Sequence, residues 1–165
     1  MSQHSLSEAL VGVFNRVFLA AESTILCGGA AEPYYEPGAP SVIYFREDFY
    51  RSALHEVAHW CVAGPVRRGL PDYGYWYVPD GRNAEQQSAF CSVEVKPQAI
   101  EALFCEALDL TFAVSVDNLT VDANCPEITH FKAAVDRQIM RFRQQGLPDR
   151  ALRFKKALAL LAVER

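Results

Sequence analysis

The sequence lacks long apolar runs. Its longest, such as residues 157–163, fall far short of the roughly 20 residues that a helix needs to cross a bilayer. The amino-terminal residues hold no positively charged stretch, and Glu8, Asn15 and Arg16 interrupt the apolar positions that follow. This pattern is not that of a signal peptide. We therefore expect a protein without a membrane span that stays in the cytoplasm.

Paired cysteines are also missing. The five cysteines are scattered, and no two of them form a Cys-x-x-Cys pair. A chain of 165 residues, of which 50% are hydrophobic, can build a core without disulfide bonds. We expect reduced thiols, most of them buried, in one domain that spans residues 1–165.

An excess of positive charge is absent too. The chain has 16 Lys and Arg against 20 Asp and Glu, which gives a net charge of -4. Nucleic-acid-binding domains are normally basic, with clustered lysine and arginine. The basic residues between positions 137 and 156 alternate with apolar ones at helical spacing, which is typical of a solvated helix face. We therefore expect no direct nucleic-acid partner.

Hydrophobic periodicity predicts an α+β fold, a mostly helical single domain with a small β-sheet. Helices are predicted over residues 6–20, 49–63, 126–145 and 148–162, and a strand over residues 41–45. Gly28 and Gly29 are expected to interrupt the chain, and residues 67–82 to form a loop with one short strand near 74–78. Pro97 either begins a new helix or lies inside one that continues to Leu110.

One segment of the predicted helix 49–63 has the pattern of a metal site: His55-Glu56-Val57-Ala58-His59. Residues four apart lie on one helix face, so His55 and His59 can bind the same ion. Glu56 occupies the zincin-type position, from which a glutamate accepts a proton from metal-bound water. The structural alternative is a pair of histidines hydrogen-bonded near the core, beside an exposed glutamate.

Two imidazoles leave a divalent ion short of protein ligands, and catalytic sites usually add a carboxylate. The candidates are Asp72, Asp80, Glu85 and Glu94. We choose Glu94 because its neighbours are apolar, and an uncompensated carboxylate is costly to bury among them. Two histidines and one carboxylate serve both zinc hydrolases and non-haem iron oxygenases, so the ligands alone do not separate these chemistries.

The metal motif belongs to a series of sequence blocks along the chain. They are His55 to Cys61, Ala63-Gly64 with Arg67-Arg68, Gly74 to Tyr77 with Pro79 to Arg82, Val93 to Ala99, and more weakly Leu103 to Cys105 and Val114 to Leu119. In this order the blocks resemble the bacterial elongation factor P hydroxylases, which modify a lysine of that translation factor. The resemblance covers most of the chain. It implies a zincin-like active-site helix and a non-haem iron (Fe²⁺) enzyme with His55, His59 and Glu94 as ligands.

The resemblance also implies a reaction. Molecular oxygen is the co-substrate, and the target is the lysine of elongation factor P that already carries a β-lysyl group. An acidic, aromatic rim would suit such a cationic side chain. We therefore predict substrate contacts from Asp72, Tyr75, Tyr77 and Asp80, with packing of this loop onto the helix as the alternative.

Two other functions stay open at this point. A zincin-type zinc metallopeptidase would use Glu56 as the general base. A non-catalytic, metal-stabilised protein-binding module would need a fourth ligand such as Cys61 or Cys91, because structural zinc sites close four protein ligands around the ion. In the hydroxylase, Glu56 is the predicted catalytic residue, elongation factor P is the protein partner, and the enzyme is expected to act as a monomer.

Overall fold

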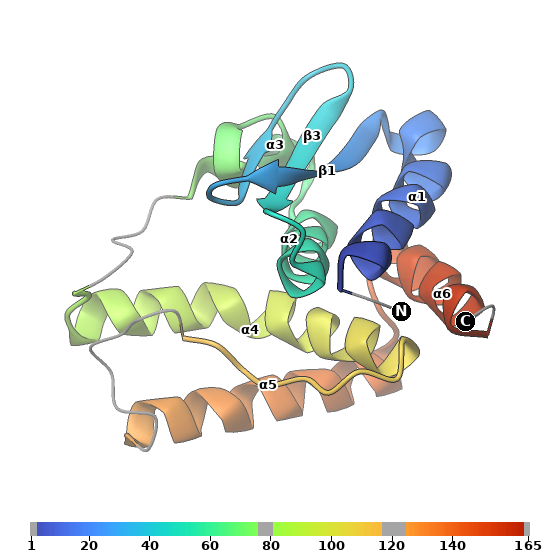
Figure 1. Ribbon diagram of the computed structural model, residues 1–165. Coiled ribbons are helices and arrows are strands. Elements are labelled where there is room, and N and C mark those ends of the chain that lie inside the picture. Colours follow the sequence, from blue (N-terminus) through green and yellow to red (C-terminus); the bar gives the residue numbers. More distant parts are fainter. Residues whose placement is uncertain (1–2, 76–80, 117–124, 164–165) are drawn as a thin grey trace.

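The computed structural model describes residues 3–75, 81–116 and 125–163 (Figure 1). Its elements are α1 (Gln3–Glu22), β1 (Thr24–Ala30), β2 (Tyr34–Glu36), β3 (Ser41–Arg46), α2 (Tyr50–Val62), α3 (Pro65–Arg68), the 3-10 helix η1 (Pro71–Gly74), α4 (Ala84–Ala107), α5 (Pro126–Gln145) and α6 (Asp149–Val163). Helices dominate and one small sheet accompanies them, which confirms the predicted α+β class.

The sheet contains three strands in the order β1-β3-β2, with β1 parallel and β2 antiparallel to β3. The expected break at Gly28 and Gly29 is wrong, because both residues lie within β1. A Cβ atom at Gly28 would lie 2.7 Å from Cζ of Phe45 and 2.8 Å from the carbonyl oxygen of Glu47. Glycine therefore lets β1 approach the end of β3 closely, where the pairing register shifts between Cys27 and Ala30 and the N–H of Gly29 donates to the carbonyl oxygen of Glu47 at 2.7 Å.

The four predicted helices are confirmed as α1, α2, α5 and α6. Pro97 lies inside α4, so the reading of one continuing helix is the right one. Strand β2, between Pro33 and Pro37, was not predicted. The short strand expected near residues 74–78 falls largely outside the described residues, and η1 ends at Gly74.

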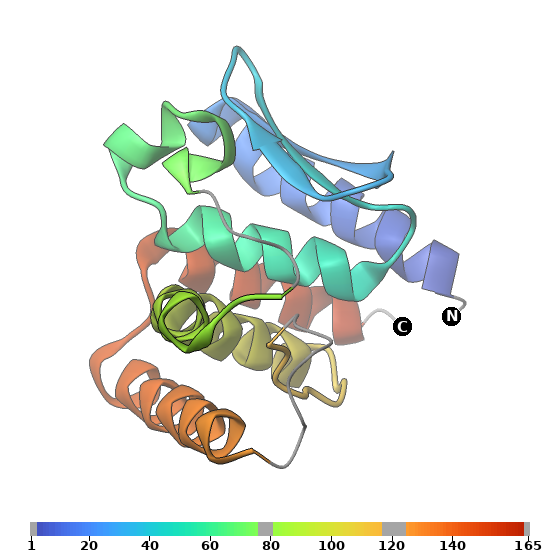
Figure 2. The same cartoon turned by 90° about the vertical axis from the view of Figure 1, so that its left-hand side faces the viewer.

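Helix α2 lies in the middle of the molecule. Figure 2 shows α1 and the sheet above it, α4 and α6 below it, and α5 outermost beneath α4. Helix α2 therefore packs against β3 on one side and against α4 on the other. A side chain on the α4-facing side of α2 meets α4 side chains rather than open solvent.

An aromatic cluster fixes the rotation of α2 about its axis. Trp60 is fully buried, with its ring 5.3 Å from that of Phe14 and 4.9 Å from that of Phe18, both on α1. Phe154 of α6 packs on Phe14 at 5.7 Å and on Phe104 of α4 at 5.1 Å. Edge-on contacts at such distances are favourable aromatic packing. With one face of α2 held in this core, a different face of the helix is left to meet α4.

All five cysteines are free thiols. Cys61 and Cys105 are buried, and the other three are partly buried. Burial raises the pKa of Cys61 to about 12, so this side chain is a neutral core group. Across the described ranges, none of the helices has both the length and the apolar character that spanning a membrane requires.

We expect the ion pair between Glu106 and Arg143 to add a small, pH-dependent stabilisation. Nη2 of Arg143 donates to Oε2 of Glu106 at 2.6 Å and so joins α5 to α4. This hydrogen bond, together with the charge of Lys155, lowers the pKa of Glu106. Since the carboxylate is about half exposed, solvent screening limits the contribution to about 1 kcal/mol at most.

The sign of the effect follows from the lowered pKa. The stabilisation is present above the unfolded-state pKa of glutamate and is lost as the pH falls through the lower folded-state pKa. Glu106→Gln should therefore lower the free energy of unfolding in urea at neutral pH and leave it unchanged in strong acid. An equal loss at both pH values would assign the effect to packing instead of charge.

Candidate metal centre

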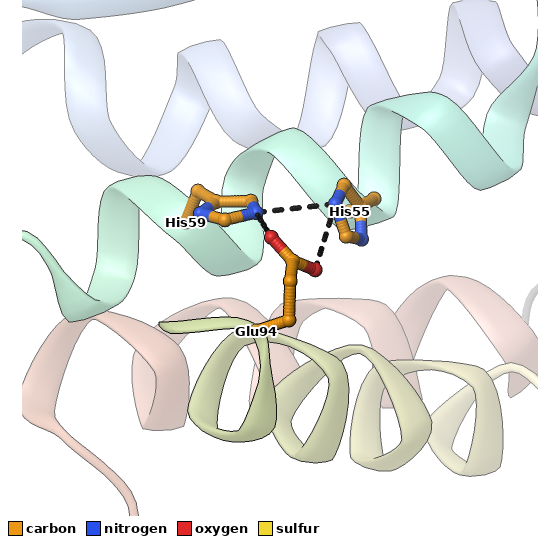
Figure 3. Close-up of side chains that lie close together, drawn as sticks. All are labelled: His55, His59 and Glu94. Atoms are coloured by element: carbon orange, nitrogen blue, oxygen red, sulfur yellow. Dashed lines mark hydrogen bonds and ion pairs between the residues drawn. The ribbon is translucent and has the colours of Figure 1, made fainter. Parts of the chain in front are cut away.

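Helix α2 brings His55 and His59 together. Both lie on the side of the helix that faces α4, and Nε2 of His55 lies 3.1 Å from Nε2 of His59 (Figure 3). The side chains are 27% and 15% exposed, so the pair borders solvent without protruding into it. The predicted convergence of the two imidazoles on one point is therefore present.

Helix α4 supplies the carboxylate. Oε1 of Glu94 lies 2.8 Å from Nε2 of His59, and Oε2 lies 3.5 Å from Nε2 of His55 (Figure 3). Ligand atoms of the three residues all lie within 4.8 Å of one another. Glu94 is only 3% exposed, although it carries a charged group. The structure thus brings together the three side chains chosen from the sequence as metal ligands.

The spacing of these atoms fits a bound divalent ion. With bonds of about 2.1 Å and angles between about 90° and 109°, adjacent ligand atoms on one metal lie about 3.0 to 3.4 Å apart. The distance of 3.1 Å between the two Nε2 atoms falls in this range, and the two distances to Glu94 bracket it. Two imidazoles and one carboxylate could therefore hold an ion with small movements and leave positions open for other ligands.

Glu101 is a functional candidate that the sequence reasoning missed. Nδ1 of His55 lies 2.8 Å from Oε2 of Glu101, which is only 8% exposed. A carboxylate only accepts hydrogen bonds, so the Nδ1 atom carries a proton, and Nε2 is the nitrogen that would bind a metal after losing its own proton. Such outer carboxylates fix the orientation and the basicity of a ligating histidine.

Gln98 holds the other side of the cluster. Its Nε2 atom donates to Oε2 of Glu94 at 3.0 Å and to the carbonyl oxygen of Ser115 at 2.6 Å. Its Oε1 atom accepts from the backbone N–H of Ser115 at 3.0 Å. Glu94, Gln98 and Glu101 repeat at the spacing of one helix face, and this periodicity was the available signal for both missed residues.

The charges at the centre perturb one another strongly. Burial by itself lowers the pKa of His55, but the hydrogen bond to Glu101 and the charge of Glu94 raise it to about 10. Burial by itself raises the pKa of Glu94, but His59 and His55 lower it to about 2. The metal-free cluster is therefore a buried carboxylate stabilised by imidazolium, and a divalent cation would take over that compensating charge.

Glu56 lies next to His55 on α2 and is partly buried. Burial raises its pKa, and the charge of Glu94 acts in the same direction, while His55 and His59 oppose the shift. A carboxyl group with a raised pKa is suited to accept and release a proton near neutral pH. The geometry leaves its predicted catalytic role as a prediction.

Comparison with known proteins decides the family. The sequence model of the family described as "Elongation factor P hydroxylase" matches residues 13–162. A protein of Haemophilus influenzae described as "Elongation factor P lysine hydroxylase" is 45% identical over 160 residues, which cover 94% of this chain and 88% of that protein. The chain belongs to the elongation factor P hydroxylase family. Membership confirms the resemblance seen in the sequence and the prediction of a hydroxylase.

The substrate-contact residues predicted for this hydroxylase are only partly described. Oδ1 of Asp72 accepts a hydrogen bond from the backbone N–H of Tyr35 at 2.8 Å, which ties η1 to β2. The guanidinium of Arg67 lies 4.0 Å from the ring centroid of Tyr75. Tyr77 and Asp80 lie outside the described residues. Asp72 thus has a structural partner, and its contact with substrate stays a prediction.

A cavity of about 680 Å³ opens beside His59. Its described lining comes from the end of α2, from α3, from η1 and Tyr75, and from Gln138 of α5, with Ser92, Val93, Val95, Lys96 and Pro97 of α4. The size suits a long side chain, since binding cavities of roughly 300–1,000 Å³ are usual. The cavity borders the candidate metal centre at His59.

Proposed function

We propose that this protein is an Fe²⁺-dependent hydroxylase of the β-lysylated lysine of elongation factor P, with His55, His59 and Glu94 as the metal ligands. The observation that carries the proposal is the convergence of these three side chains, of which His59 also lines a cavity, in a member of the hydroxylase family. Modification of a translation factor also argues for work in the cytoplasm.

The chemistry divides between the ion and the protein. Bound ferrous iron would supply the activation of molecular oxygen, for which protein side chains have no equivalent. Glu101 would hold His55 with Nε2 toward the ion, and Gln98 would orient Glu94. Glu56, whose pKa is raised by burial, would relay protons beside the ligands. The cavity beside His59 would receive the lysyl side chain.

The direct test is mass spectrometry of lysylated elongation factor P. The purified protein is loaded anaerobically with Fe²⁺ and then exposed to oxygen and an excess of a chemical electron donor, together with the lysylated factor. The donor is needed because inserting one oxygen atom into a C–H bond leaves the other atom to be reduced to water by two electrons and two protons. We expect the modified lysine to gain the mass of one oxygen atom, and protein loaded with Zn²⁺ to give no such gain. If the modified lysine does not gain the mass of an oxygen atom although the protein is fully loaded with iron, the proposal is wrong.

A zinc peptidase is the second candidate, and Glu56 is the residue that favours it. In a peptidase this glutamate would be the general base for metal-bound water. A structural zinc module fits less well, because the cluster among the described residues joins three ligand residues and includes neither Cys61 nor Cys91.

Glu56→Gln separates the hydroxylase from the peptidase. If Glu56 relays protons for hydroxylation, the variant should retain its iron and lose about 100-fold in turnover, the lower end of what a general acid or base contributes. Iron content by elemental analysis and oxygen incorporation by mass spectrometry give the two readouts. Peptide cleavage by the zinc-loaded wild type that disappears in Glu56→Gln would support the peptidase instead.

A further inference from the structure

A second cavity lies next to the one beside His59. It measures about 710 Å³ and lies between the first half of α4 and the start of α5. Ser92 and Val95 of α4 line both cavities. The two cavities therefore border each other on α4, and together we call them the α4 groove, which reaches from His59 to the amino-terminal end of α5.

The α4 groove is basic, although the chain as a whole is acidic. The charged residues among the described lining of the first cavity are Arg67 and Lys96, apart from the histidine of the metal centre. Arg82 and Arg137 line the second cavity, where Glu127 is the carboxylate among the described lining residues. The whole chain has a net charge of -4, so the positive charge of this groove is a local feature. It suits the binding of a negatively charged partner surface.

Three of these cations lie at the surface and can face a partner. Arg67, Lys96 and Arg137 are exposed. Arg82 is buried, and its Nη2 atom donates a hydrogen bond to the carbonyl oxygen of Val116 at 2.8 Å. We therefore do not count Arg82 among the cations that face a partner. Arg67 is held in place by a hydrogen bond of 2.9 Å from Nη1 to the carbonyl oxygen of Tyr73.

The charge changes sign toward the metal centre. Glu94 and Glu101 contact the two histidines, whereas the cations line the groove outside. A cationic lysyl side chain would be attracted to the inner carboxylates and repelled by the rim. The pattern therefore fits a lysine that is presented from an acidic protein surface, with the lysine inside and the acidic residues against the rim.

We propose that the α4 groove, through Arg67, Lys96 and Arg137, docks an acidic surface of elongation factor P that surrounds the modified lysine. This rests on the proposed function, because it takes that translation factor as the substrate. The rim would act on recognition of the protein substrate and not on the chemical step. It would raise the association rate and weaken as salt screens the charges.

The test reverses charges on the rim and compares them with a reversal elsewhere. Lys96→Glu with Arg137→Glu is the test variant. Lys156→Glu is the control, because Lys156 is exposed on α6, which contributes no residue to the described lining of either cavity. Affinity for lysylated elongation factor P is measured by surface plasmon resonance, separately from turnover and from metal content.

We expect the test variant to bind the factor about tenfold more weakly at low salt, with a smaller difference at high salt, and to keep its metal. Lys156→Glu should bind like the wild type.

Equal affinities of test and control variants would overturn the docking proposal even if the wild type hydroxylates the factor. A wild type that binds but does not hydroxylate would overturn the proposed function alone. A short RNA that binds the groove as tightly as the factor would also overturn docking.

Discussion

Glu94→Ala is expected to empty the metal centre and abolish hydroxylation. Glu94 is the carboxylate that lies against both imidazoles, at 2.8 Å from His59 and 3.5 Å from His55. Loss of a hydrogen-bonding partner of a ligand typically costs about 10–100-fold in metal affinity or activity. Loss of a ligand itself should exceed that, because the ion then keeps two neutral imidazoles and no charge to balance its own.

Elemental analysis of the variant, together with oxygen incorporation into the lysylated factor, measures both effects. Glu94→Gln keeps the shape of the side chain and separates the loss of charge from the loss of packing, since its amide can still bond to Gln98. Glu85→Ala is the matched control: it makes the same change in the same helix, at an exposed carboxylate that was also a candidate ligand. Full iron content in Glu94→Ala would refute the assigned ligand set.

Metal affinity is expected to rise steeply with pH. In the metal-free protein the pKa of His55 is raised to about 10 by Glu101 and Glu94, so at neutral pH a proton occupies the nitrogen that the metal needs. Metal binding must release that proton. Below a pH of about 10, each unit of falling pH should lower the apparent affinity about tenfold, or about 1,000-fold over three units.

Glu101→Gln tests the cause of this dependence. The variant removes the charge that stabilises the His55 imidazolium, so the pKa of His55 should fall and the slope of affinity against pH should flatten above neutrality. The lost orientation of His55 also weakens binding by about 10–100-fold, so the slope and not the absolute affinity is the decisive quantity. A purely structural role for Glu101 would change affinity equally at every pH.

The measurement is a Co²⁺ titration in competition with a chromophoric chelator at several pH values. Proton release is followed by calorimetry in buffers of different ionisation enthalpy. Glu106→Gln provides the control, because it alters another carboxylate of α4 that lies on the surface beside Arg143. An unchanged slope in Glu101→Gln would remove Glu101 as the source of the raised pKa of His55.

Local patterns in the sequence were sufficient for α1, α2, α5 and α6 and for the two histidines of the candidate metal centre, but not for α3 or for the course of α4 at Pro97. The spacing of His55 and His59 within one predicted helix places both rings on the same face, whatever surrounds that helix. Glu94 followed from the cost of burying a charge among apolar neighbours. Gly28 was misread because its role depends on the approach of Phe45, which lies on another strand.

The sequence by itself determined four of the helices, the α+β class, the paired imidazoles and, through its similarity blocks, the family. Only the tertiary structure decided that Glu101 meets His55 across 46 residues of chain, that Gln98 joins Glu94 to Ser115, and that cations line the groove outside. The physical reason is that these contacts join residues far apart in the sequence. Periodicity reports which residues share a face of one helix, whereas the packing of α4 against α2 and α5 sets which faces meet.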